Sequence, residues 1–290
     1  METEKEAAFQ IHKIEETPPC QKKPLVFYDE EKKEKKRKRR VLLGRILVGV
    51  LLVAGWEIFT RLGWMDVYFW SRPSAIFLTT KEQLFHGTLL RDIAYTASST
   101  VIGFITGTVC GALLGLSFWW SKTYAHISEP YIIIFNAMPK LALAPVLVIM
   151  FGIGFFSKVM LAFLMTVVTT ALSTYSGVKS VDPAMETLLY SLGAKRRQVF
   201  GKIVVPWSMP WVVSSLRIPI ASPLAGAIVG EFISADRGLG RMIIYAGTIF
   251  ALHLVWAGVF VLSVLATLMV AAVLLLAPLR KFFSKLIGKM

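Results

Sequence analysis

Residues 93–121 have the sequence IAYTASSTVIGFITGTVCGALLGLSFWWS, a run of 29 residues without a formal charge. A helix needs about 20 mainly apolar residues to cross the hydrocarbon core of a bilayer, because its backbone rises only ~1.5 Å per residue. The run is therefore long enough for a membrane-spanning helix. It predicts that the surroundings of this part of the chain are lipid.

Five more apolar intervals extend this prediction to most of the chain. Hydrophobic residues make up 55% of the sequence and charged residues 17%, whereas a soluble domain has about 25% charged residues. We therefore predict an all-α membrane protein with about six transmembrane helices. The spans lie within residues 41–59, 93–121, 130–157, 159–178, 207–233 and about 254–277.

The distribution of lysine and arginine predicts the orientation of the chain in the membrane. With a cytoplasmic N-terminus, the cytoplasmic segments hold 23 basic residues and the outer segments 7. Cytoplasmic loops of membrane proteins carry an excess of Lys and Arg. The count predicts that both termini of this multi-pass chain are cytoplasmic.

The two ends of the chain are charged. Residues 1–40 alternate acids and bases and end in the run EEKKEKKRKRR at residues 30–40, a composition that favours a disordered cytoplasmic tail. The basic run fixes topology, and such runs also bind anionic lipid head groups. The transmembrane domain is expected over residues 41–285, followed by a basic end over residues 286–290.

Catalytic and metal chemistry have no support in the sequence. Cys20 lies in the charged tail and Cys110 in an apolar run, and the 4 His residues are not paired with cysteines. No Gly-x4-Gly-Lys-Ser/Thr phosphate loop is present, so the chain is not predicted to hydrolyse ATP. We expect no enzyme activity, no metal site and no cofactor bound by this chain.

The cytoplasmic segment 179–206 predicts a docking surface. Asp182 can cap a helix that Pro183 opens, and Gly193 can end that helix before a second short helix runs toward Pro206. Two short amphipathic helices joined by a glycine exceed what a connection between two spans needs. The segment is therefore expected to bind a partner.

This segment resembles the EAA loop of permease subunits in bacterial ATP-binding-cassette (ABC) importers. Gly193 is followed by Ile203 and Pro206 at the spacing of that loop, with Val205 in place of Leu. Residues 187–189 stand where Glu-Ala-Ala is expected, and Glu186 comes one position earlier. The resemblance implies that the ATPase-coupling residues are Glu186, Gly193, Ala194, Ile203 and Pro206, and it leaves open which acid contacts the ATPase.

Other motifs resemble the branch of this family that imports nitrate, sulfonates, taurine, bicarbonate or thiamine-precursor pyrimidines. They include NAMPKLALAP at residues 136–145, FGIG at 151–154, SRPS at 71–74 and GLG at 238–240. The resemblance implies a second permease subunit, with a homodimer expected, two ATP-binding subunits that carry ATP and Mg²⁺, and an extracytoplasmic solute-binding protein. It also implies a multi-pass protein of the bacterial inner membrane, with no nucleic acid partner.

Two hypotheses for the class of solute remain. The first is a small anion, and the alternative is a neutral thiamine-precursor pyrimidine. An ion-coupled secondary carrier is less favoured, because predicted spans two, four and six contain no acid that could bind a coupling ion near the midplane.

Small and charged residues inside the spans give further hypotheses. Gly103, Gly107, Gly111 and Gly115 form a stripe that permits close helix packing, with a neighbour in the same subunit or in the partner subunit. Lys140 and Arg217 lie on segments that prolines should kink, and we expect them to border the translocation path.

Glu231 is expected to support the turn at Gly238-Leu239-Gly240. This is a structural role, separate from the path residues.

Overall fold

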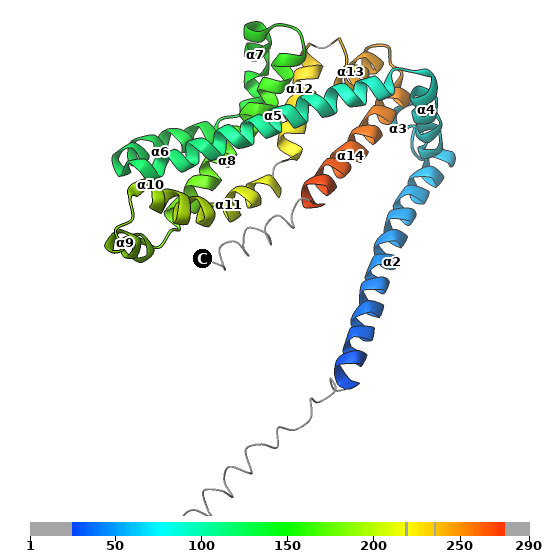
Figure 1. Cartoon of the computed structure of the whole chain (residues 1–290). Helices are drawn as coiled ribbons and strands as arrows, with labels where there is room; N and C mark the ends of the chain where they lie inside the picture. The colour runs from blue at the N-terminus through cyan, green and yellow to red at the C-terminus, as the bar shows by residue number, and fades with distance from the viewer. Residues whose placement is uncertain (1–24, 218–219, 235, 276–290) are drawn as a thin grey trace, which may run out of the picture. The chain divides into compact units, whose positions relative to one another are not determined.

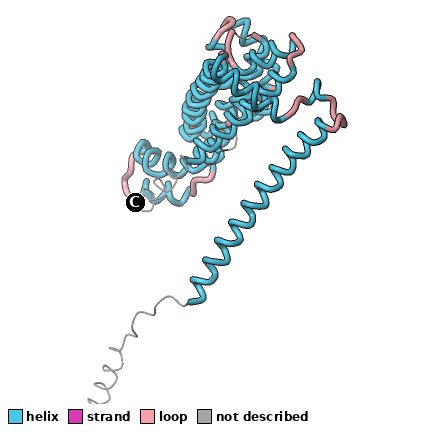
Figure 2. Tube along the Cα trace, turned by 90° about the vertical axis from the view of Figure 1, so that its right-hand side faces the viewer, coloured by secondary structure: helices cyan, strands magenta, loops and turns pink. Residues whose placement is uncertain are grey.

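The computed structural model describes residues 25–217, 220–234 and 236–275, and this part of the chain contains helices and turns but no strand (Figures 1 and 2). The all-α fold class is confirmed. The chain divides into two units, residues 1–62 and residues 63–290, which are described separately.

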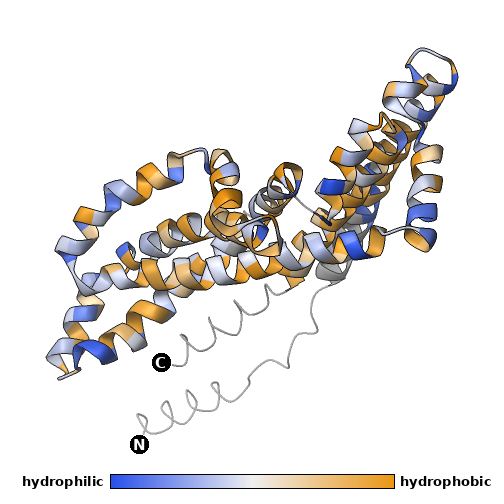
Figure 3. Ribbon diagram, turned by 90° about the horizontal axis from the view of Figure 1, so that it is seen from above, coloured by the Kyte–Doolittle hydropathy of each residue, from blue (hydrophilic) through white to orange (hydrophobic). Residues whose placement is uncertain are grey.

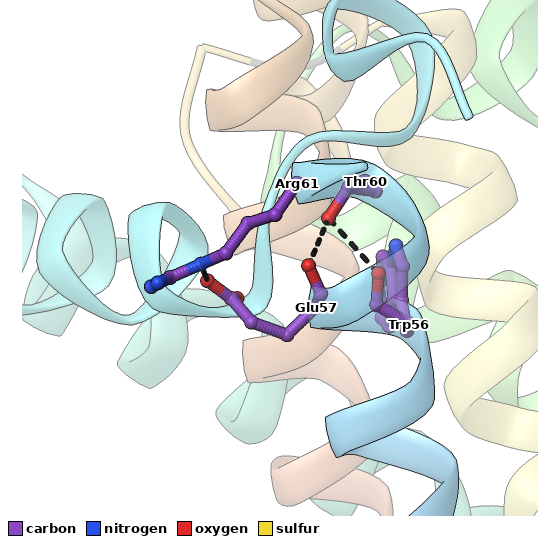
Figure 4. Close-up of polar contacts among 4 residues, drawn as sticks. All are labelled: Trp56, Glu57, Thr60 and Arg61. Atoms are coloured by element: carbon purple, nitrogen blue, oxygen red, sulfur yellow. Dashed lines mark hydrogen bonds and ion pairs between the residues drawn. The ribbon is translucent and has the colours of Figure 1, made fainter. Parts of the chain in front are cut away.

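The described part of the first unit is one helix, α2 (Leu25–Arg61). Its segment Arg39–Arg61 is long and apolar enough to cross a membrane, which agrees with the span predicted at 41–59. Near its C-terminal end, the Thr60 hydroxyl donates to the Trp56 and Glu57 carbonyls at 2.9 and 3.0 Å, and Arg61 Nε pairs with Glu57 Oε1 at 2.7 Å (Figure 4). The side chains of Thr60, Glu57 and Arg61 thus find partners within the helix itself.

The helix α2 begins within the predicted charged tail. The helix includes residues 25–40, which contain no Gly or Pro and are rich in Glu, Lys and Arg. These charged residues are good helix formers, so the segment can continue the membrane helix toward the N-terminus. The predictions for residues 1–24 and 276–290 lie outside the described residues.

The second unit contains the remaining described helices. In chain order they are α3 (Val67–Trp70), α4 (Pro73–His86), α5 (Leu89–Ser117), the 3₁₀ turn η1 (Phe118–Trp120), α6 (Lys122–Ala137), the 3₁₀ turn η2 (Lys140–Leu143), α7 (Ala144–Phe151), α8 (Phe155–Lys179), α9 (Pro183–Ser191), α10 (Arg196–Val199), the π-helical turn η3 (Phe200–Val204), α11 (Val205–Arg217), α12 (Ala221–Ile233), α13 (Leu239–Thr248) and α14 (Leu252–Leu275).

Four described helices are long and apolar enough to span a membrane, or five if one bent pair counts as a span. The four are the end of α2, α5 with η1, α8, and α14. The bent pair is residues 122–137 and 140–151, with an angle of 82° between its halves. The third predicted interval is therefore broken at Pro139, which cannot donate a backbone hydrogen bond.

The fifth predicted interval, 207–233, also differs from one continuous helix. It contains α11 and α12, which are described as separate helices. The prolines predicted to kink this region lack the amide hydrogen that an unbroken helix would use. Apolar residues cover much of the helices of the second unit (Figure 3), as expected for surfaces that face lipid or other subunits.

The glycine stripe of α5 packs against α8 of the same chain. A Cβ placed on Gly103 would lie 2.6 Å from the Val159 carbonyl oxygen, and one on Gly115 would lie 2.6 Å from that of Ala171. Cβ positions on Gly107 and Gly111 would similarly overlap α8. The backbones of α5 and α8 therefore meet closely over more than three turns. The helix that packs on the glycine stripe belongs to the same chain.

A buried polar cluster joins α5, α8, α12 and α13. We call it the Glu231 cluster, and its side chains are Asp92, Thr96, Lys158 and Glu231, each at most 2% exposed. Glu231 accepts hydrogen bonds from the Thr96 hydroxyl at 2.8 Å and from the Gly240 amide at 2.7 Å. The predicted contact of Glu231 with the 238–240 turn is confirmed.

The remaining bonds of the cluster complete the capping of α13. Asp92 accepts from the Gly238 amide at 2.9 Å, and the Thr96 hydroxyl oxygen accepts from the Leu239 amide at 3.0 Å. Lys158 donates to the carbonyl of Ser234. The first amides of a helix have no partner within the helix, so side chains from two other helices supply the acceptors for α13.

We predict that Gly107→Val destabilises the fold. A Cβ at Gly107 would lie 2.9 Å from the Phe163 carbonyl oxygen of α8, and overpacking typically costs about 1–3 kcal/mol. The matched control is Gly247→Val, because Gly247 has no atom within 4 Å of the added Cβ. Denaturant unfolding of the purified protein in detergent would measure the difference, and equal stability of the two variants would contradict the packing.

We also predict that Glu231→Gln weakens the Glu231 cluster. The amide nitrogen replaces one acceptor oxygen by a donor, so the 2.8 Å bond from Thr96 to Oε1 loses its acceptor and the one remaining oxygen must accept from both Thr96 and the Gly240 amide. A lost buried hydrogen bond costs about 1–3 kcal/mol. Glu82→Gln, on the exposed surface of α4, provides the control. Hydrogen exchange should speed up at the first turn of α13 only in Glu231→Gln; unchanged exchange there would argue against the capping role.

Candidate functional site

The segment after α8 forms two short helices joined at a glycine. Asp182 Oδ1 accepts from the Ala184 amide at 2.9 Å, and Pro183 is the first residue of α9. After α9, Gly193 has a φ of +80°, which a residue with a side chain rarely adopts. The Ala194 amide donates to the Leu189 carbonyl at 3.0 Å, so the turn closes the helix end.

The short helix α9 presents apolar side chains on its surface. None of its residues is buried. Met185, Leu188 and the following Leu192 are 44%, 58% and 73% exposed. Exposed apolar residues at one place on a helix mark a surface for a partner or for lipid.

Two of the predicted coupling residues lie together at this turn. Gly193 and Ala194 line a pocket of about 270 Å³ whose other lining residues are Leu189, Leu192, Gln198 and Lys202. Ile203 lies in η3 and Pro206 in the first turn of α11, and both are half-buried. They therefore belong to the helix that leads away from the turn, and neither lines that pocket.

Glu186 has a partner within the same chain. Its Oε1 accepts a hydrogen bond from Trp119 Nε1 at 3.0 Å. Trp119 belongs to η1, at the end of α5. The sequence comparison with the EAA pattern gave no reason to expect this contact, because the two residues lie 67 positions apart.

Lys140 lies at the bend between α6 and α7. It is the first residue of η2, so it occupies the break, whereas the sequence placed it within a kinked span. Its ammonium group donates to the Asn136 carbonyl at 3.0 Å and contacts Asn136 Oδ1 at 3.4 Å. Both acceptors are neutral. Among the described residues, Lys140 forms no ion pair with a carboxylate.

Arg217 is the last residue of α11, and its side chain lies outside the described residues. Of the two predicted path residues, Lys140 is the one whose side-chain contacts the structure describes. Within the described part of the chain, no group of three His, Cys, Asp or Glu side chains is arranged to hold a metal ion.

Comparison with known proteins identifies the family. Residues 107–281 match the family model described as "Binding-protein-dependent transport system inner membrane component". The formylaminopyrimidine transport permease protein ThiX of Halalkalibacterium halodurans is 33% identical over 227 residues, which cover 77% of this chain and 89% of ThiX. The taurine transport system permease protein TauC of Escherichia coli is 33% identical over 182 residues, covering 63% of this chain and 66% of TauC.

A solved structure shares the fold. A chain of the MetNI methionine ABC transporter, in an inward-facing conformation, aligns with a TM-score of 0.56 and 18% identity, covering 66% of this chain and 98% of that chain. With the family match and the relatives, this establishes a multi-pass protein of the inner membrane. The chain belongs to the binding-protein-dependent transport system inner membrane components, the permeases of ABC importers.

Proposed function

We propose that this permease forms the path of an ATP-driven importer for a small solute, with α9 and the Gly193 turn as the surface that binds the ATPase. The observation that carries the proposal is the exposed apolar surface of α9 beside a turn whose geometry requires glycine. A soluble partner that buries Met185, Leu188 and Leu192 would gain about 25 cal/mol per Å² of apolar area removed from water.

The expected assembly follows the family. In our proposal two copies of the permease pair, two ATPase subunits bind ATP and Mg²⁺ and contact the two α9 surfaces, and a binding protein delivers the solute. The chain itself supplies no phosphate-binding loop. Its contribution is to change conformation when the ATPase moves α9 and α10.

A small anion, such as a sulfonate, taurine, nitrate or bicarbonate, is our first candidate for the solute. Lys140 supports it, because its ammonium group is held by neutral oxygens at a break between helices, where its charge can attract an anion. The similarity to TauC agrees with this choice. A pyrimidine is the second candidate, favoured by the similarity to ThiX over 89% of that protein.

We expect Gly193→Ala to weaken ATPase binding. Alanine in the left-handed region costs roughly 1–2 kcal/mol, so the turn should leave its present geometry. The control is Gly201→Ala, because both positions have open space around an added Cβ but only Gly193 has a positive φ. Co-purification of the ATPase with each variant is the measurement, and equal retention by both would count against the docking surface.

We expect Lys140→Gln to slow the uptake of an anion by roughly 3–10-fold, as expected from the loss of one weakly screened charge. Glutamine retains hydrogen-bonding groups for Asn136. Lys81→Gln, on the exposed face of α4, removes a charge elsewhere and should transport normally. Uptake of sulfonates and of pyrimidines would be measured in vesicles with the matching binding protein; unchanged anion uptake would remove Lys140 from the path, and pyrimidine uptake alone would favour the second candidate.

A further inference from the structure

Two adjacent tryptophans hold the α9–α10 segment to the end of α5. Trp119 Nε1 donates to Glu186 of α9 at 3.0 Å. The Arg196 guanidinium of α10 lies over the Trp119 and Trp120 rings at 5.3 and 5.4 Å from their centroids, and it donates to the Trp120 carbonyl. We call this set, with Phe200, the tryptophan clasp.

Phe200 extends the clasp into η3. Its ring centroid lies 5.4 Å from those of both tryptophans. Cation–π contacts contribute about 0.5–1 kcal/mol at exposed sites, and aromatic pairs contribute similar amounts. Several such contacts converge on two residues, so the end of α5 is attached to each part of the α9–α10–η3 segment.

The clasp matters because α9 packs loosely elsewhere. A pocket of about 520 Å³ lies between α9 and the helices α6 and α8, and its lining includes Lys122, His126, Tyr175, Lys179, Glu186 and Tyr190. No residue of α9 is buried. Residues 180–182 connect α9 to the end of α8. The clasp, whose Trp119 and Arg196 also line this pocket, adds a side-chain connection from α9 to the end of α5.

The helix α5 connects the clasp with the Glu231 cluster. It has 29 residues, which at ~1.5 Å per residue is about 44 Å. In Figure 1 it runs from the end of the unit with α9 and α10 to the end with α13. Asp92 and Thr96, near its start, cap the first turn of α13. One stiff helix thus has the clasp at one end and the cap of α13 at the other.

We propose that the tryptophan clasp transmits movement of the ATPase-bound α9–α10 segment to α5, and through the Glu231 cluster to α13. Trp119 is then a positioning residue for coupling, and it is not part of the ATPase-binding surface. This inference rests on the proposed role of α9 in binding the ATPase. It predicts that breaking the clasp separates ATP hydrolysis from transport while leaving the complex assembled.

The test is Trp119→Leu in the complete complex of permease, ATPase and binding protein in lipid nanodiscs and vesicles. Leucine removes both the indole donor and the ring beneath Arg196. Trp119→Phe keeps a ring and removes only the donor, so it should show a smaller defect. Trp64→Leu removes a tryptophan that is 75% exposed and serves as the matched control.

Two readouts separate coupling from assembly. We expect Trp119→Leu to retain the ATPase on purification, but to lower solute uptake per ATP hydrolysed by at least about fivefold, the lower range of usual coupling energies. Hydrogen exchange of residues 238–248 should change on trapping the ATPase with vanadate in the parent and in Trp64→Leu. In Trp119→Leu that response should be lost.

Two outcomes overturn the inference, and a third separates it from the proposed function. If the exchange response and the ratio of uptake to hydrolysis match those of the parent, the clasp does not transmit movement. If Trp119→Leu loses the ATPase while Trp119→Phe retains it with normal coupling, Trp119 only supports the docking surface. If Gly193→Ala does not weaken ATPase binding but Trp119→Leu still uncouples transport, the docking surface is wrong and the transmission role stands.

Discussion

The close approach of α5 to α8 through four glycines is the contact on which the rest of the second unit depends. In a membrane the burial of apolar side chains gives little drive for helix association, so tight backbone packing has to supply it. Carbonyl oxygens of α8 occupy the space that side chains on the α5 stripe would need. With α5 fixed on α8, other faces of α8 are available to α11 and α12, which contact it as well.

This pairing also explains how charged groups can be buried at one end. Asp92 and Thr96 come from the first turns of α5, and Lys158 comes from the first turn of α8. Removing a buried charge from water is costly unless its hydrogen bonds are replaced. The amides of the 238–240 turn replace them for the two carboxylates, and a side chain on Gly238 would collide with the carboxylate of Glu231.

Local rules allowed the sequence to predict much of this architecture. Apolar length identified the positions of α5, α8 and α14, the glycine period identified the packed face of α5, and Asp182 and Gly193 identified the ends of α9. Each rule uses residues within a few turns of one another. Lys158 lies between the predicted spans 130–157 and 159–178, yet it is fully buried. These rules cannot predict its burial, because its partner at Ser234 lies 76 residues away.

Contacts between residues far apart in the sequence also determine the coupling segment 179–206 and the bend at Pro139. Proline predicted a kink, but the 82° angle depends on how both halves pack. Likewise Glu186 and Trp119 became partners only through the fold.

The solute is harder to predict, because the residues that stabilise the fold differ from those that select the solute. ThiX and TauC have names that refer to chemically different solutes, yet each is 33% identical to this chain. Residues that pack helices and satisfy buried polar groups are needed whatever crosses the membrane, so similarity over the whole fold does not by itself identify the solute. Specificity has to come from few side chains at the path and from the binding protein. In our proposal Lys140, held by neutral groups at a break between helices, borders the path, so the effect of replacing it is more informative about the solute than the identity of the whole chain.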